Sequence, residues 1–315
     1  MSFSKRFIAS SVLASLVLSI SAIPTQAAPK NQARAVAQAD WLEQNLDNPK
    51  VRIIEVSTEP GVYERGHIKN AVKFVWHTDL VDTVNRDIIN AKNFSKLAQK
   101  VGINDDTTVV LYGDKNNWFA AWGAWIFNIY GQKDVRILDG GRVKWEKDGR
   151  ALTTAVPTFS NGNFSVTKAD KSLRATLLRD VLPVAKKRIK ADLIDIRSAD
   201  EFSGKIFAPA GFQELAVRAG HIPGAINVPW GQNVNEDGTF KTVADLKKLY
   251  ADKGVDGKQS IITYCRIGER SSLTWFVLSE ILGYEVKNYD GSWTEYGNSV
   301  GVPIQNPAGT IWGAA

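Results

Sequence analysis

The stretch QSIITYCRIGERSSLTWFVLSEILGYEVKNYDGS, residues 259–292, carries the pattern that decides the fold. It begins with an apolar run at 260–264 that is typical of a buried parallel strand. Beyond a turn that contains glycine, apolar residues recur at helical spacing, and a second strand-like run follows at 285–289. Strands that alternate with helices in this way predict an α/β fold with a parallel sheet.

The same pattern occurs once before in the chain, in TTVVLYGDKNNWFAAWGAWIFNIYGQKDVRILDGG, residues 107–141. The similarity extends upstream, because residues 51–76 resemble residues 191–230 and each segment contains the turn GHI. The second copy is longer by an insertion within 205–218. We therefore expect two tandem domains of one fold, because a unit of this length is too long for a solenoid repeat.

The predicted domain boundaries follow from this repeat. The first domain spans 33–153 and the second spans 173–315. The turn-rich segment 154–172, which has no helical period, is the expected linker.

The N-terminus has the features of a signal peptide. Lys5 and Arg6 precede an apolar run at 7–23, and small residues lead to Ala27. This order predicts a secretory signal peptide over residues 1–27 and a periplasmic or secreted protein. No later segment is long and apolar enough to span a bilayer, so no membrane contact is expected after the signal is removed.

Composition argues against several classes of function. The chain has 315 residues and a formal net charge of +6, and the excess of positive charge is spread along the sequence. The basic run at 186–190 is typical of a solvated helix face, so nucleic acid is not an expected partner. Three dispersed histidines and one cysteine do not form the pattern of a metal site.

Cys265 is the only cysteine, which is unusual for an exported protein, where cysteines tend to pair. It lies between a predicted strand and a predicted helix that starts near Arg270 or Ser271. The helix N-terminus and the cations of Arg266 and Arg270 all favour the thiolate. Gly268 lets the backbone turn tightly, so that the loop amides can form an anion site. These features predict a nucleophilic sulfur whose substrate is an anion with an electrophilic centre.

The spacing bears on which anion is attacked. A cysteine phosphatase loop places five residues between its cysteine and its arginine, and its cradle fits a tetrahedral phosphate. Only four residues separate Cys265 from Arg270. The tighter loop favours attack on a sulfur atom that projects from the anion, although a phosphatase-like hydrolase stays open as an alternative.

These motifs resemble those of a tandem-domain rhodanese, a thiosulfate sulfurtransferase, over nearly the whole mature chain. The resemblance rests on the two GHI turns, on the DGG and DGS strand ends, and on a six-residue loop that begins at Cys265. It implies two domains that each have a mainly parallel five-stranded sheet flanked by helices. A loop that begins Cys-Arg is typical of the thiosulfate-using branch, although the familiar animal enzyme has a lysine where Ile267 stands.

The resemblance also implies a mechanism and a set of site residues. Cys265 would attack the outer sulfur of thiosulfate, expel sulfite, and pass the sulfur from a persulfide to a thiophilic acceptor such as cyanide or a thiol. Metal and organic cofactors are not needed, and the protein is expected to be a monomer. The substrate-binding residues would be the arginines and the rest of the loop: Arg266, Arg270, Arg197, Ile267, Gly268, Glu269 and Ser271.

The first half lacks this chemistry, because Gly113 aligns with Cys265 and is followed by Asp114, which would repel an anion. We expect this half to pack against the second and to form one wall of a cleft. Three of its tryptophans could line that wall, but core positions are favoured for each of them: Trp76, Trp118 and Trp122.

Further expectations concern single residues of both halves. Asp195 is interpreted as structural, and so are the matched histidines, His67 and His221. Glu269 is expected to point outward, because a carboxylate beside the thiol would oppose anion binding.

Two alternatives use the same Cys265. One is a 3-mercaptopyruvate sulfurtransferase, although that branch typically has Cys-Gly at the start of the loop. The other is a persulfide carrier that delivers sulfur to a protein partner. The insertion at 205–218 could be a docking element for such a partner, or a flap over the cleft.

Overall fold

The computed structural model of the protein describes residues 32–211 and 215–313. The predicted signal peptide at 1–27 lies outside the described residues. Within the described ranges, no helix combines the length and the apolar character that a membrane span requires.

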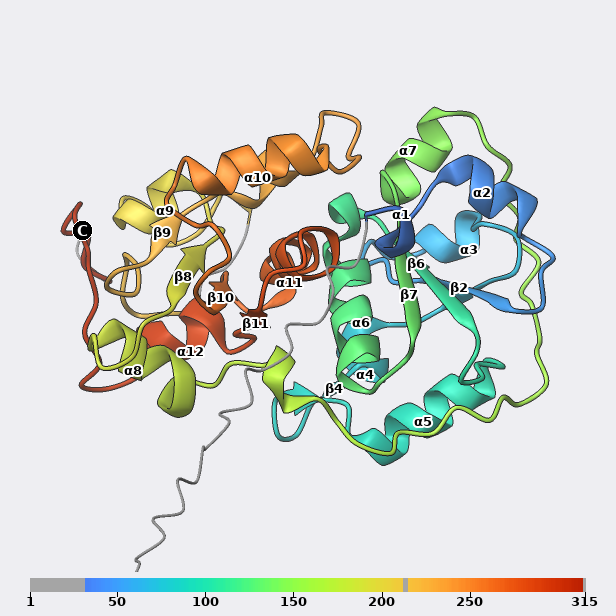
Figure 1. Ribbon diagram of the computed structural model, residues 1–315, viewed down its shortest axis with the longest axis horizontal. Coiled ribbons are helices and arrows are strands. Elements are labelled where there is room, and N and C mark those ends of the chain that lie inside the picture. The colour runs from blue at the N-terminus through green and yellow to red at the C-terminus, as the bar shows by residue number, and fades with distance from the viewer. Residues whose placement is uncertain (1–31, 212–214, 314–315) are drawn as a thin grey trace, which may run out of the picture.

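The first half contains a five-stranded sheet in which all neighbouring strands are parallel (Figure 1). Its order is β1 (Val36–Ala37), β7 (Asp134–Leu138), β6 (Thr108–Tyr112), β2 (Val51–Glu55) and β3 (Ala71–Lys73). The central strands β2 and β6 are almost entirely buried, as expected for a sheet covered on both faces.

The helices of this half flank its sheet and connect its strands. They are α1 (Gln32–Ala35), α2 (Ala39–Gln44), α3 (Val62–Arg65), α4 (Trp76–Asp79), α5 (Ala91–Lys100), α6 (Trp118–Ile129) and α7 (Gly141–Lys147). Beside them, a small antiparallel hairpin is formed by β4 (Val81–Asp82) and β5 (Asp87–Ile88). This hairpin contacts the second half through Arg86, which lies between its two strands.

The second half repeats the arrangement with four parallel strands. Its order is β11 (Val286–Asn288), β10 (Ile261–Tyr264), β8 (Asp192–Asp195) and β9 (Ile226–Asn227). Its helices are α8 (Leu182–Ala185), α9 (Ala199–Ser203), α10 (Val243–Ala251), α11 (Glu269–Phe276) and α12 (Ser292–Asn298). The tandem α/β fold is therefore confirmed.

The prediction of a fifth strand in the second sheet is wrong. Where β1 lies beside β7 in the first half, the second half has one isolated parallel bridge between Arg174 and Asn288. Beyond this bridge the chain leaves the sheet and enters the helical turn Leu177–Val181, and the N–H of Thr176 donates to the Asp180 carboxylate of that turn (2.8 Å). That local hydrogen bond competes with a further rung of the ladder.

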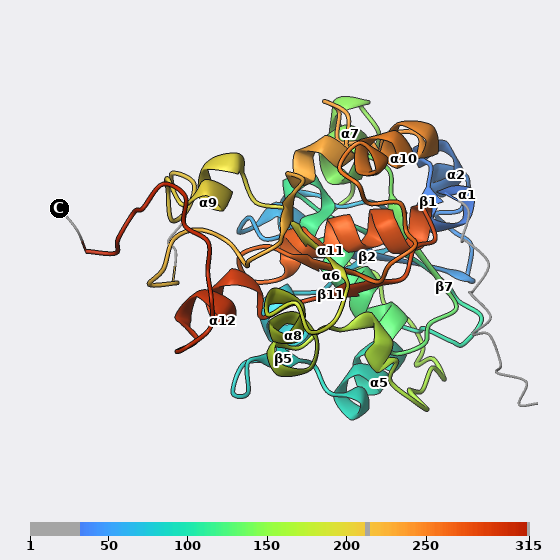
Figure 2. The ribbon, with the colours of Figure 1, turned by 60° about the vertical axis from the view of Figure 1, so that its left-hand side comes forward.

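The two halves share one apolar core. Helices α6 and α11 pack against each other at the centre of the molecule in both views (Figure 1, Figure 2). Helix α6 is apolar and buried around nearly its whole circumference, because it lies between its own sheet and α11. The buried cluster that contains Trp125 of α6 also contains Trp275 of α11. This packing sets the carboxyl end of β10 against the first half.

Candidate active site

Cys265 follows directly after β10, at the carboxyl end of the strand, where ligands bind in parallel α/β sheets. The loop turns at Gly268, and α11 begins at Glu269, one residue before the expected start. Gly268 has a φ of +106°, and a Cβ there would lie 2.7 Å from the Cα of Asp290. Both the backbone angle and the close approach of the chain require glycine.

The sulfur of Cys265 has a fixed place inside this loop. Its Sγ accepts a hydrogen bond from the N–H of Gly268 (3.1 Å). The N–H of Cys265 donates to Oγ of Ser292 (3.1 Å), whose hydroxyl in turn lies 2.7 Å from the carbonyl oxygen of Tyr289. A backbone N–H directed at the sulfur stabilises negative charge on it, because charge-assisted hydrogen bonds are the stronger kind.

The first turn of α12 holds the loop in place. The N–H groups of Trp293 and Thr294 donate to the carbonyls of Cys265 (3.0 Å) and Arg266 (2.9 Å). Ser292 itself has a positive φ of 50°, which is unfavourable for a residue with a side chain. The local strain therefore accompanies the hydrogen bond that positions Cys265.

The first half shows what the second has changed. Gly141 stands where the second half has Ser292, and its φ of +57° is similar. There, the N–H of Gly113 donates to Oδ1 of Asn117 instead (3.0 Å). A Cβ at Gly113 would lie 2.3 Å from the carbonyl oxygen of Val56, so this position has no room for a cysteine.

Asp114 of the first half is also engaged in local hydrogen bonds. Its carboxylate accepts the N–H groups of Thr58 (3.0 Å) and Glu59 (2.8 Å) and closes its own loop. The described geometry around Gly113 thus provides a packed turn in place of an anion cradle.

Arg270 is held by an ion pair with Glu201 of α9 (3.2 Å between Nη2 and Oε1). Its guanidinium also lies 5.9 Å from the centre of the Trp118 ring, which belongs to the first half. Burial alone would lower the pKa of Arg270, but the negative charges of Cys265 and Glu201 raise it. Arg270 therefore stays charged beside the sulfur.

A pocket of about 490 Å³ opens between the two halves beside the loop. Its lining includes Arg266, Ile267, Glu269 and Arg270, which lie on both sides of Gly268. The rest of the wall is mainly apolar and comes from both halves and from the insertion: Thr58, Trp76, Lys115, Trp118, Phe119, Ser198, Glu201, Pro209, Pro229, Trp230 and Gly231.

The three tryptophans considered for the cleft wall divide between the pocket and the core. Trp76 and Trp118 line the pocket, so the preference for core positions is wrong for these two. Trp118 meets Trp230 of the second half edge to face, with ring centres 4.8 Å apart. Trp122 is a buried core residue, as expected.

The expected outward orientation of Glu269 is wrong, because the side chain is only 4% exposed and lines the pocket. This residue is the first of α11 and is buried there. Burial raises the pKa of Glu269 to about 7, although its own backbone N–H and the charges of Arg86, Arg266 and Arg270 act in the opposite direction. The carboxyl group can therefore be neutral or charged near neutral pH.

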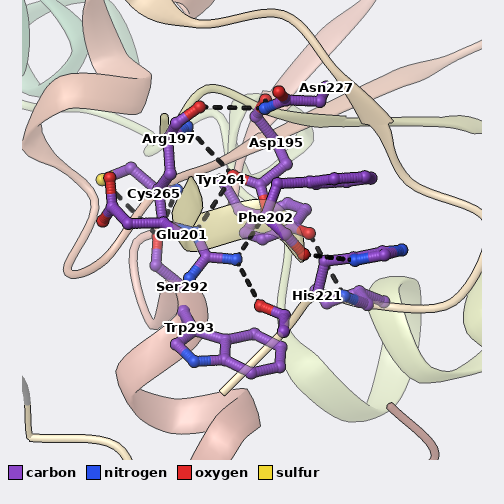
Figure 3. Close-up of polar contacts among 12 residues, drawn as sticks. Asp195, Arg197, Glu201, Phe202, His221, Asn227, Tyr264, Cys265, Ser292 and Trp293 are labelled. Carbon is purple, nitrogen blue, oxygen red and sulfur yellow. Dashed lines mark hydrogen bonds and ion pairs between the residues drawn. The ribbon is translucent and has the colours of Figure 1, made fainter. Parts of the chain in front are cut away.

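Arg197 does not lie among the residues that line the pocket, although we expected it to hold the substrate. Its side chain is 1% exposed and donates to both oxygens of Asp195 (3.0 and 2.6 Å) and to the carbonyl of Gly220 (2.7 Å). Figure 3 shows this side chain among Asp195, Tyr264 and Trp293. Asp195 is structural in this arrangement.

The first half contains the same contact, although its arginine comes from another part of the sequence. Arg142 of α7 donates to the carboxylate of Glu55 (3.0 Å) and to the carbonyl of Gly66 (2.6 Å). Since the half without a cysteine needs this buried pair too, its role in both halves is to join a strand end to the GHI turn.

The remaining expected residues are structural or lie outside the pocket. The Ser271 hydroxyl lies 2.9 Å from the carbonyl oxygen of Gly268 and 2.7 Å from Oδ1 of Asn288. His67 and His221 are buried, and each has Nδ1 within hydrogen-bond distance of a backbone carbonyl oxygen, at 2.9 and 2.6 Å.

Three residues of the site were not identified from the sequence. Glu201 carried only the signal of a helix start, because it forms a capping box with Ser198. Ser292 could have been found from the change of DGG to DGS between the halves. Arg86, in the hairpin of the first half, carried no signal; it donates to the carbonyls of Ile267 (3.1 Å) and Asp290 (3.3 Å).

Comparison with known proteins assigns both halves to one family of domains. The family model for the rhodanese-like domain matches residues 38–148 and again residues 182–299. A Mycolicibacterium smegmatis protein named "Putative thiosulfate sulfurtransferase" is 52% identical over 272 residues, which cover 86% of this chain and 97% of the relative.

Two other similar proteins have different names. The sulfur carrier protein TtuD of Thermus thermophilus is 50% identical over 274 residues, covering 85% of this chain and 95% of the relative. The crystal structure of SseA from Escherichia coli, described as a 3-mercaptopyruvate sulfotransferase, superposes with a TM-score of 0.70 at 28% identity. That match covers 82% of this chain and 98% of SseA.

Proposed function

Because the chain belongs to the rhodanese family and is a sulfurtransferase, we propose that it uses thiosulfate as its sulfur donor and Cys265 as its nucleophile. The observation that carries the proposal is the cradle around the sulfur. Gly268 directs an N–H at Sγ, and the guanidinium-bearing residues on both sides of it, Arg266 and Arg270, line one pocket. A thiolate and an anionic donor both fit this arrangement.

The first half-reaction forms a persulfide. The Cys265 thiolate attacks the outer sulfur of thiosulfate, the S–S bond of the donor breaks, and its electron pair leaves with sulfite. Arg266 and Arg270 bind the sulfonate oxygens and stabilise the departing charge, while the N–H of Gly268 stabilises the sulfur before attack.

The second half-reaction returns the enzyme to its starting state. A thiophilic acceptor, cyanide or a thiol, attacks the outer sulfur of the persulfide, and Cys265 leaves as the thiolate that Gly268 again stabilises. The sequence of two chemical steps with one product released between them is ping-pong kinetics.

A persulfide carrier is the second candidate, supported by the relative that is named a sulfur carrier. In that role Cys265 would hold the same persulfide but deliver it to a protein. Pro209, in the described part of the insertion, lines the pocket beside the loop that begins at Cys265.

A panel of steady-state assays tests the proposed donor. Wild-type protein should form thiocyanate from thiosulfate and cyanide faster than it transfers sulfur from 3-mercaptopyruvate to a thiol, and it should not hydrolyse an aryl phosphate. Cys265→Ser should abolish thiocyanate formation, and Arg188→Ala, a change at an exposed arginine, should leave it intact. Faster turnover of mercaptopyruvate, or activity in Cys265→Ser, would contradict the proposal.

From the signal-like N-terminus we propose separately that the mature protein acts in the periplasm or outside the cell, and we propose that it is a monomer. Cell fractionation of the full chain and of a chain that lacks residues 1–27 tests the location. Retention of the full chain in the cytoplasm would contradict it, and elution of the mature chain as a dimer would contradict the monomer.

A further inference from the structure

One charged side chain in the pocket has no role in the donor step. Glu269 lines the pocket four positions after Cys265 in sequence, and it is almost completely buried. A carboxylate at this place repels a thiosulfate dianion. The ion pair of Arg270 is made with Glu201, so the geometry of Arg270 does not depend on Glu269.

The pocket is also larger and more apolar than the small ligands require. Cyanide has two heavy atoms, and it fills about the volume of one or two water molecules, about 30 to 60 Å³. The pocket of about 490 Å³ is instead walled by the rings of Trp76, Trp118, Phe119 and Trp230. Such walls favour a ligand with an apolar organic part.

We propose that Glu269 is the general base that removes the proton from an organic thiol acceptor bound in this pocket. The proposal rests on the proposed sulfurtransferase function and names the acceptor class. The Glu269 carboxylate takes the proton of the thiol, and the resulting thiolate attacks the outer sulfur of the persulfide. The S–S bond of the persulfide breaks, Cys265 leaves as the thiolate, and an organic persulfide is released.

The charged groups around Glu269 come from five segments of the chain. Arg266 lies before it in the loop and Arg270 follows it on α11, and the charge of Arg86, in the hairpin of the first half, also acts on it. Glu201 of α9 and Lys115 of the turn before α6 line the same pocket. Burial outweighs the three nearby arginines and raises the pKa of Glu269 to about 7, close to where a general base works best at neutral pH.

The raised pKa also explains how the Glu269 carboxyl group can lie in a pocket that binds an anion. A bound thiosulfate dianion favours the protonated form of Glu269, which removes the repulsion during the donor step. Once sulfite has left, the carboxyl group can ionise and serve the acceptor. The neutral form of Glu269 thus leaves the donor step undisturbed, and the ionised form serves the acceptor step.

The test compares two thiol acceptors of similar size in wild type and Glu269→Gln at pH 7. An alkyl thiol with a pKa near 8.5 is only about 3% ionised at this pH, so a base can contribute at most about thirtyfold. We expect Glu269→Gln to lower kcat/KM for the alkyl thiol by about tenfold to thirtyfold. For an acidic aryl thiol that is already mostly ionised, the loss should be less than about twofold.

The donor half-reaction is the control that separates this inference from the proposed function. Sulfite release in the first turnover with thiosulfate should be unchanged or faster in Glu269→Gln, and Glu285→Gln, a change at an exposed acid, should match wild type in every arm. An equal loss with both thiols would overturn the role of base. Absence of sulfite release from wild type would contradict the proposed function itself, and the inference with it.

The wild-type pH profile is a second measure that does not depend on the folding of a variant. With the alkyl thiol, kcat/KM should fall as the pH drops through about 7, where Glu269 becomes protonated. A profile that follows only the ionisation of the thiol, near 8.5, would overturn the proposal.

Discussion

Arg86, in a hairpin of the first half, donates a hydrogen bond to the carbonyl oxygen of Ile267 in the loop that begins at Cys265 (3.1 Å). The same guanidinium donates to the carbonyl of Asp290, in the turn that precedes Ser292 (3.3 Å). The half without a cysteine thus contacts both segments that position the sulfur. The first half therefore helps to position the loop, in addition to supplying aromatic rings to the pocket wall.

Removing this contact should slow the reaction without unfolding the protein. The Arg86 side chain is 54% exposed, so solvent weakens its hydrogen bonds and we expect Arg86→Ala to lower kcat/KM for thiosulfate by about threefold to tenfold. Arg65→Ala, which changes an exposed arginine that bonds only within its own turn, is the matched control. Equal rates for Arg86→Ala and Arg65→Ala would show that the hairpin does not position the loop.

Ser292 offers a test that separates strain from hydrogen bonding. Both Ser292→Ala and Ser292→Gly remove the acceptor of the Cys265 N–H, but only glycine relieves the positive φ. We expect the glycine variant to be the more stable of the two in chemical denaturation. Both variants should form the persulfide about tenfold more slowly than wild type, since a buried N–H loses its partner. A wild-type rate in Ser292→Gly would contradict the role given to the hydroxyl.

The raised pKa of Glu269 also predicts how stability depends on pH. The folded protein holds this proton up to about pH 7, whereas the unfolded chain releases it near 4.5, so stability is lost as the pH rises between these values. Glu269→Gln removes that loss. The variant should be more stable than wild type at pH 8 by up to about 3 kcal/mol, and its advantage should be close to zero at pH 4.

Urea unfolding of both proteins at the two pH values measures this difference. Glu285→Gln, which changes an exposed acid, should show little dependence on pH relative to wild type. An advantage of Glu269→Gln that is equal at both pH values would mean that the carboxyl group does not titrate between them.

The buried pair of Arg197 and Asp195 should behave like the pair of Arg142 and Glu55. Removal of one partner leaves an uncompensated buried charge, which typically costs about 3–5 kcal/mol. We expect Arg197→Ala and Arg142→Ala to lower the free energy of unfolding by similar amounts. The KM for thiosulfate, measured on the folded fraction, should change less than about threefold in either variant. A tenfold rise in KM in Arg197→Ala alone would restore Arg197 to the substrate site.

The fold and the position of the loop at Cys265 could be predicted because local sequence patterns indicate both. The repeat of apolar strand, glycine turn and apolar helix fixed the α/β architecture, and the unique Cys265 with Arg266 and Arg270 marked the loop. The absence of the fifth strand from the second sheet could not be predicted, because the hydrogen bond from the N–H of Thr176 to Asp180 leaves no mark in the apolar pattern.

The errors in the site have a common cause, which is that side-chain direction depends on tertiary contacts. Arg197 follows a strand end, but its guanidinium turns back to Asp195 and Gly220. Glu269 lies in a pocket lined by residues of both halves, which the local sequence does not indicate. Arg86 is 181 positions from Ile267 in sequence, so no local pattern could connect them.

The most direct test of the proposed mechanism is the intact mass of the protein after one exposure to thiosulfate. The mass should increase by one sulfur atom, peptide mapping should place that atom on Cys265, and one equivalent of sulfite should be released. Addition of cyanide should return the original mass and produce thiocyanate. An unchanged mass with no sulfite released, or an added sulfur that persists in Cys265→Ser, would contradict sulfur transfer through Cys265.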